Sequence, residues 1–118
     1  MKYVYIEAHD EKTPEYVFLR TFLDHYEIDD VTIVPINGKD NLKNLQPKMM
    51  QNQLEGDTIC VLFDADEAAN GGGYAVRKEA INKTLEQMGI RDVDVFLWPN
   101  NQDDGDFEMM LEHIVRRE

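Results

Sequence analysis

The sequence predicts a three-layer α/β domain in which a four-stranded parallel sheet carries helices on both faces, in a Rossmann-like arrangement. Short apolar runs alternate with helical patterns along the chain, and this order requires right-handed crossovers between parallel strands. The runs are apolar almost throughout, as is typical of strands buried on both faces. Pro35 cannot donate a hydrogen bond within a sheet, so its strand is expected at an edge, which favours the strand order 2-1-3-4.

The predicted strands are rich in β-branched and aromatic residues. They cover residues 3–6, 31–36, 58–63 and 93–98. Cys60, the only cysteine, lies inside the third run, where a thiol is expected to pack as a small hydrophobic group. A chain of 118 residues fits one domain that spans residues 1–118. The fourth strand is expected to be a free edge at which a homodimer can form.

The first two helical patterns precede the second and third strands. The first begins with Thr13 as the N-cap and Pro14 as the first helical residue. Its apolar stripe consists of Tyr16, Leu19, Phe22, Leu23 and Tyr26. The second begins near residues 40–41, and Pro47 must kink this helix or divide it in two.

The other two helical patterns flank the last strand. The third runs from about residue 74 to residue 88, and Gly89 follows where a left-handed residue ends a helix. The glycine run 71–73 is expected to be a mobile loop, because it lacks the Lys and Ser/Thr of a phosphate-binding loop. The fourth begins after Gly105, with Asp106 as its N-cap. This helix is expected to bury Phe107, Met110, Leu111 and Ile114.

The charge of the chain limits its partners. Twelve Lys and Arg against 24 Asp and Glu give a formal net charge of −12 at pH 7. This charge repels nucleic-acid phosphates unless metal ions or a basic partner offset it, so it argues against a stand-alone DNA-binding module. The sequence has no signal-peptide pattern and no apolar stretch near the ~20 residues of a membrane helix. We therefore expect a cytoplasmic protein without a membrane segment.

Acidic residues follow the first and third strands, which are neighbours in the predicted sheet. Glu7 ends the first strand, and Asp64 and Asp66 follow the third. Converging carboxylates repel each other unless a cation lies between them, and Mg²⁺ or Mn²⁺ takes such oxygen ligands. A carboxylate that is not a ligand, such as Glu7, can then transfer a proton. The alternative is that these residues only end strands and cap the following turns.

The pattern of strands and polar ends resembles the Toprim domain over nearly the whole chain. It consists of a strand ending in Glu7, a strand ending in Asn37-Gly38, and an apolar strand closed by Asp64-Ala65-Asp66. That family includes type IA and type II topoisomerases, bacterial primases, small maturation ribonucleases and the nucleases named for overcoming a lysogenization defect. Gly38-Lys39-Asp40-Asn41-Leu42 and Gly105-Asp106-Phe107-Glu108 resemble small Toprim-like proteins related to the last group.

The resemblance implies a role for each matching residue. Glu7 corresponds to the catalytic glutamate, and Asp64 and Asp66 correspond to the metal-binding pair. The further candidates are Glu11 as a metal ligand and Gly38 and Lys39 in substrate binding. Ala8 stands where the family usually has glycine.

Two functions from different classes follow from these residues. The first is a Mg²⁺-dependent phosphodiester hydrolase or nucleotidyl-transfer domain that acts on nucleic acid, with an ATPase or a basic protein as a partner. Arg77 and Lys78 are then the candidates for the basic residue of the nuclease branch. The second is a non-catalytic module that binds a nucleotide or a protein partner. The net charge of −12 and Ala8 favour the second function.

Overall fold

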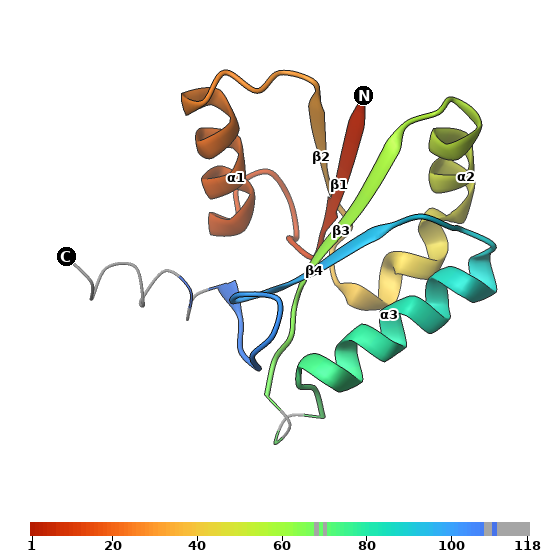
Figure 1. Cartoon of the computed structure of the whole chain (residues 1–118). Helices are drawn as coiled ribbons and strands as arrows, with labels where there is room; N and C mark the ends of the chain where they lie inside the picture. The colour runs from red at the N-terminus through yellow and green to blue at the C-terminus, as the bar shows by residue number, and fades with distance from the viewer. Residues whose placement is uncertain (68, 70, 108–109, 111–118) are drawn as a thin grey trace.

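The computed structural model confirms the predicted α/β fold and describes residues 1–67, 69, 71–107 and 110. A four-stranded, all-parallel sheet has the order β2-β1-β3-β4 (Figure 1). The strands are β1 (Lys2–Ile6), β2 (Val31–Pro35), β3 (Thr58–Asp64) and β4 (Asp94–Trp98). Pro35 ends the edge strand β2 opposite Ile6, at a place where its missing N–H is tolerated.

Helices cover both faces of the sheet. They are α1 (Pro14–His25), the 3₁₀ helix η1 (Lys39–Leu45), α2 (Gln46–Leu54) and α3 (Tyr74–Met88). Helix α1 lies on one face, and α2 and α3 lie on the other (Figure 1). Pro47 lies in the first turn of α2, so the predicted break in the second helix is the junction of η1 and α2.

Alternate residues of each strand supply two separate cores. On the face of α2 and α3, Tyr5, Val61 and Phe63 are buried against helix residues such as Leu85. On the face of α1, the buried residues include Ile6, Ile33, Leu62, Trp98 and Phe107. The Tyr5 hydroxyl donates a hydrogen bond to the Asn52 side chain within the first core. This alternation also decides where the side chains beyond each strand lie.

The ends of the helices follow local sequence signals. Thr13 has the extended backbone of an N-cap and Pro14 follows as the first residue of α1, as predicted. Gly89 ends α3 with a left-handed backbone, at φ 76°, also as predicted. Burial, together with the charge of Asp94, raises the pKa of the Cys60 thiol to about 11, so the thiol packs as a neutral group.

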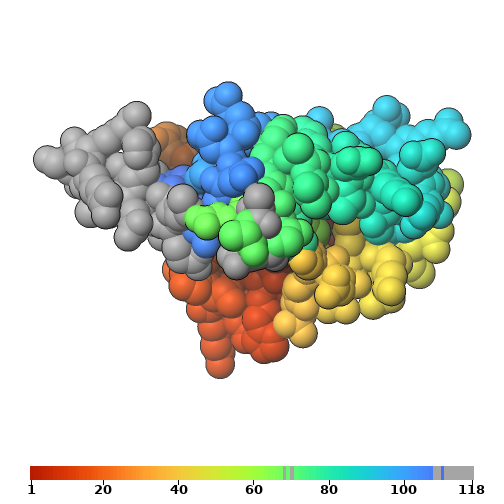
Figure 2. All heavy atoms as spheres, turned by 90° about the horizontal axis from the view of Figure 1, so that it is seen from below, coloured from red at the N-terminus to blue at the C-terminus, as the bar shows by residue number. Residues whose placement is uncertain are grey.

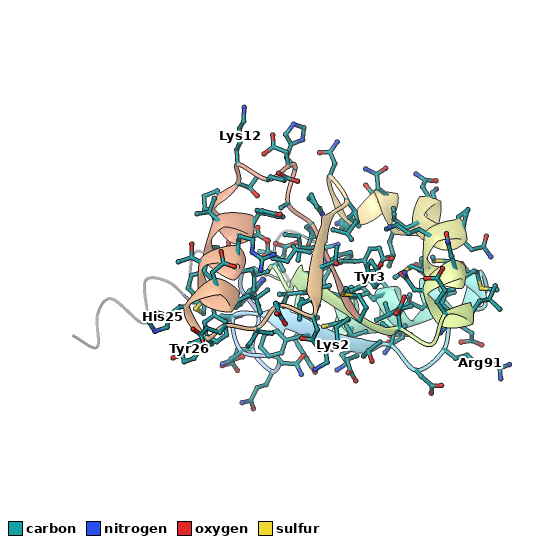
Figure 3. All side chains as sticks on the ribbon, turned by 90° about the horizontal axis from the view of Figure 1, so that it is seen from above. Lys2, Tyr3, Lys12, His25, Tyr26 and Arg91 are labelled. Atoms are coloured by element: carbon teal, nitrogen blue, oxygen red, sulfur yellow. The ribbon has the colours of Figure 1, made fainter. Side chains whose placement is uncertain are left out.

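The predicted core stripe of α1 is only partly correct. Phe22 is 46% exposed and Tyr26 is 61% exposed, whereas Phe18, which the stripe omitted, packs against the core. Tyr26 lies beyond the C-terminal end of α1, at the periphery of the domain (Figure 3). The helix therefore contacts the sheet with a narrower face than its apolar residues suggest.

The helix predicted after Gly105 is described only in part. Phe107 is fully buried and Met110 packs against the α1 face, as expected. The positions of Leu111 and Ile114 in this prediction lie outside the described residues. Within the described ranges, the structure contains no helix with the length and apolar character that a membrane span requires.

Candidate active site

The candidate site lies where β1 and β3 end side by side. Ile6 pairs with Leu62 in the parallel register, so the residues after β1 come next to the last residues of β3. The N–H of Asp64 donates a hydrogen bond to Oε1 of Glu7 at 2.5 Å. Figure 2 shows this end of the sheet, where the segments after β1 and β2 and the loops after β3 and β4 meet. Glu7 and Asp64, predicted from distant segments, are thus brought together.

Strand alternation directs Glu7 and Asp64 to different faces of the sheet. Tyr5 belongs to the core under α2 and α3, and Glu7 follows two residues later on the same side. Leu62 belongs to the core under α1, and Asp64 follows two residues later on that side. The acids therefore straddle the edge of the sheet.

Asp64 lies in a strongly negative, partly buried environment. Burial, together with the negative charges of Glu15, Glu7 and Asp66, raises the pKa of Asp64 to about 8. The N–H of Phe107 donates a hydrogen bond to its Oδ1 at 2.9 Å, which opposes the shift. A carboxyl group with such a pKa holds a proton near neutral pH unless a positive charge comes close.

Glu15 is the site residue that the sequence analysis missed. It lies in the first turn of α1, and it is the neighbour with the largest charge effect on Asp64. One signal was available: the first turn of the helix after β1 begins at the same edge of the sheet as the ends of the strands.

Asp66 differs from Asp64 because it has a basic partner. Nη2 of Arg77, on α3, lies 2.7 Å from Oδ2 of Asp66. Asp66 also has a left-handed backbone, at φ 61°, and its N–H and C=O pair with Gly105. A Cβ atom on Gly72 would lie 2.8 Å from Cβ of Asp66 and 3.0 Å from the C=O of Ala65, so only glycine fits beside this pair.

The glycine run is packed rather than loose at two of its three positions. Gly72 and Gly73 are buried, and Gly73 donates its N–H to the C=O of Ala65 at 2.8 Å. Asp104, from the loop after β4, accepts a hydrogen bond from the N–H of Tyr74 at 2.6 Å and holds the start of α3. Gly72 and Gly73 are therefore packed against neighbouring groups, and the mobility of the run stays a prediction.

A pocket of about 250 Å³ lies beside Glu7 on the α3 side of the sheet. Its charged lining residues are Glu7, Lys39, Asp40 and Arg77. Burial raises the pKa of Glu7, and the N–H of Asp64 and the charges of Arg77 and Lys39 oppose this rise. A glutamate with a raised pKa is suited to proton transfer.

The other residues singled out in the sequence lie around the site at different distances from Glu7 and Asp64. Gly38 donates its N–H to the C=O of Glu7 at 2.9 Å and has a positive φ of 103°, so it fixes the loop beside the site. Glu11 is exposed in the turn before α1, and no contact described in the structure joins it to the other acids. Ala8 is buried, with 5% of its surface exposed, and its methyl group belongs to the core under α1.

The acids offer the right donor type for a divalent cation, although they are held apart. All donors are carboxylate oxygens, which Mg²⁺ prefers, and the negative charges of Glu15, Glu7 and Asp66 act on Asp64. Among the described residues, no group of three or more His, Cys, Asp and Glu side chains is arranged to hold a metal ion. One oxygen each of Asp64 and Asp66 is engaged by Phe107 and Arg77. A cation shared by both aspartates would therefore bind the second oxygen of each or displace these contacts.

Comparisons with known proteins do not assign a family. No protein-family model matches the chain, no curated protein matches its sequence, and no solved structure matches its fold. The parallel α/β architecture rests on the structure itself, and the resemblance to the Toprim family stays a prediction from the motifs.

Proposed function

We propose that this protein is a Mg²⁺-dependent phosphodiester hydrolase or nucleotidyl-transfer domain of the Toprim kind that acts on nucleic acid. The meeting of Glu7 with Asp64 at the carboxyl ends of two neighbouring parallel strands carries this proposal. Ligand sites of open parallel sheets lie at this edge. The acids and the adjacent basic side chains offer both a place for a cation and a contact for a phosphate group.

Each residue has a distinct role in this proposal. Asp64 and Asp66 would hold the cation, which when bound neutralises phosphate charge and lowers the pKa of water. Glu7 accepts or donates the proton of the reaction at its carboxyl group. Arg77, the nearer of the two basic candidates, offsets negative charge beside Asp66. Glu15 adds negative charge next to Asp64 and so favours the bound cation.

A binding module without catalysis is the second candidate. The net charge of −12 favours it, because a nuclease that works alone must attract a polyanion. The ion pair between Asp66 and Arg77 also favours it, since this pair already neutralises one of the two candidate metal ligands. Such a module would bind a nucleotide or a protein through the same edge of the sheet.

The decisive experiment is cleavage of single-stranded and double-stranded DNA and RNA with Mg²⁺, with Mn²⁺ and with a chelator. We expect cleavage that requires the cation and that falls at least ~100-fold in Glu7→Gln, the usual scale of general acid–base catalysis. Glu79→Gln is the matched control, because it removes the same charge from an exposed position on α3. It should cleave like the parent protein.

Three outcomes separate the candidates. Cation-dependent cleavage lost only in Glu7→Gln supports the enzyme. Cation binding without any cleavage supports the binding module instead. Cleavage that is equal in both variants excludes Glu7 as the proton-transfer group and contradicts the proposal.

A further inference from the structure

The pocket beside Glu7 is lined by both basic and apolar side chains. Lys39 comes from η1 and Arg77 from α3, so two separate elements bring positive charge to one cavity. The apolar lining consists of Leu42, Phe63, Ala80 and Ile81. Glu7 and Asp40 line the same pocket, so its charged lining is balanced rather than acidic, in contrast to the chain as a whole.

Arg77 is only partly used by the contacts that the structure describes. Its Nη2 binds Asp66, whereas its Nε is buried and has no hydrogen-bond partner among the described residues. A buried donor without a partner is costly, and a guanidinium group presents several donors in one plane. The Arg77 side chain is 14% exposed, so it is held in place. Arg77 is thus a cation held in a fixed position beside the pocket.

Resting on the proposed function, we infer that Lys39 and Arg77 form a subsite for the phosphate group of a single nucleotide, which lies next to Glu7 with its sugar against the apolar lining residues of the pocket. A guanidinium and an ammonium group are the side chains that bind phosphate oxygens best. The substrate is then a free nucleotide or a single-stranded end rather than a duplex.

The size of the pocket and the charge of the chain both favour one nucleotide over a duplex. The volume of about 250 Å³ is below the ~300–1,000 Å³ of typical small-molecule sites, so it has no room for a base pair. A duplex presents one phosphate charge about every 1.7 Å, and a chain of net charge −12 repels this dense array more than it repels one phosphate.

The ion pair of Arg77 links this subsite to the cation site. Asp66 and the phosphate compete for the same guanidinium group, so a cation on Asp66 releases Arg77 toward the phosphate. Coupling between two ligands is reciprocal, so the phosphate must strengthen cation binding by the same factor. We expect adenosine 5′-monophosphate to bind at least about fivefold more tightly with Mg²⁺ than without it.

The test measures binding rather than cleavage, by calorimetric titration of the full chain. Adenosine 5′-monophosphate should bind, and adenosine should bind at least about tenfold more weakly, because it lacks the phosphate. Lys39→Gln and Arg77→Gln should each weaken the nucleotide about tenfold. Arg77→Gln should also reduce the effect of Mg²⁺ on nucleotide affinity. Lys39 is exposed, so its variant keeps the fold even if Arg77→Gln perturbs it.

Matched controls test whether the nucleotide depends on the basic residues of the pocket or on any positive charge of the chain. Lys43→Gln removes the same charge from the same 3₁₀ helix, and Lys43 does not line the pocket. Arg91→Gln removes an arginine at the far edge of the domain (Figure 3). Both should change the affinity for the nucleotide less than twofold. If these controls lose as much affinity for the nucleotide as Lys39→Gln does, the inferred subsite is wrong.

Two further ligands identify the source of the phosphate. A 5′-phosphorylated single-stranded oligothymidylate that binds more tightly than adenosine 5′-monophosphate points to strand ends, and equal binding points to free nucleotides. Tighter binding of a duplex of the same length overturns the inference. Cleavage that depends on Glu7 with nucleotide binding unaffected by Lys39→Gln and Arg77→Gln refutes the subsite alone. Nucleotide binding that depends on both residues, without cleavage, refutes the proposed function alone.

Discussion

The carboxylates on the two sides of the sheet edge have different charged neighbours. On the α1 side, Asp64 has Glu15 beside it and forms no ion pair among the described residues. On the α3 side, Asp66 is paired with Arg77, and Lys39 lines the adjoining pocket. Asp64 and Asp66 are two residues apart in the chain, yet only one of them has its charge balanced. The α1 side therefore has the stronger need for an added cation, and the α3 side is better prepared for an anion.

The largest expected effect concerns the packing that holds the α1 side. Phe107 is fully buried, its ring lies 5.1 Å from that of Trp98 and 5.5 Å from that of Phe18, and its N–H binds Asp64. Phe107→Ala should lower the free energy of unfolding by about 3–5 kcal/mol, measured by urea denaturation. Phe22→Ala, at a ring that is 46% exposed, should cost less than about 1 kcal/mol. Equal losses would show that this aromatic cluster does not stabilise the site.

Cation binding is the next largest effect. At 100 times its dissociation constant, Mg²⁺ should add about 2.7 kcal/mol to the free energy of unfolding and raise the melting temperature by several degrees. The double variant Asp64→Asn/Asp66→Asn should lose this gain. Asp29→Asn/Asp30→Asn is the matched control, since it removes two exposed charges before β2. A gain that survives in the site variant would place the cation elsewhere.

The close packing on the α3 side can be broken at Gly72. Gly72→Ala should lower the free energy of unfolding by about 1–3 kcal/mol, because the added methyl group would clash with Asp66 and with the backbone of Ala65. In Gly71→Ala the added methyl group has no neighbour within 4 Å, so only the positive φ should lower the free energy of unfolding, by about 1 kcal/mol. Thermal and urea unfolding of both variants measure the difference. Wild-type stability of Gly72→Ala would mean that the loop adapts.

A dependence of stability on pH that originates at Asp64 is expected as well. Its folded pKa of about 8 lies above its usual value of 3.8, so the native state binds the proton more tightly than the unfolded state does. This stabilisation is complete below pH ~4 and is lost as the pH rises to about 8, with a slope of at most about 1.4 kcal/mol per pH unit. Urea unfolding without metal ions, between pH 5 and pH 8, should show a flatter profile for Asp64→Asn. Parallel profiles would contradict the shifted pKa.

The strands and their order were predictable because their signals are local. Continuous apolar runs identify buried parallel strands, and Pro35 is compatible only with an edge. The break at Pro47 and the end of α3 at Gly89 depend on the backbone limits of single residues. The meeting of Glu7 with Asp64 followed from the strand order, since neighbouring parallel strands end together.

The partners of each acid could not be predicted in the same way. The sequence alone determined which strands end in acids and at which edge of the sheet these acids lie. Only the tertiary structure decided that Glu15 lies near Asp64, that Arg77 pairs with Asp66, and that Gly72 leaves room for this pair. These contacts join residues from separate helices, loops and strands, and their geometry depends on how α1 and α3 pack on opposite faces of the sheet. Periodicity and propensity describe one segment at a time, so they carry no information about such packing.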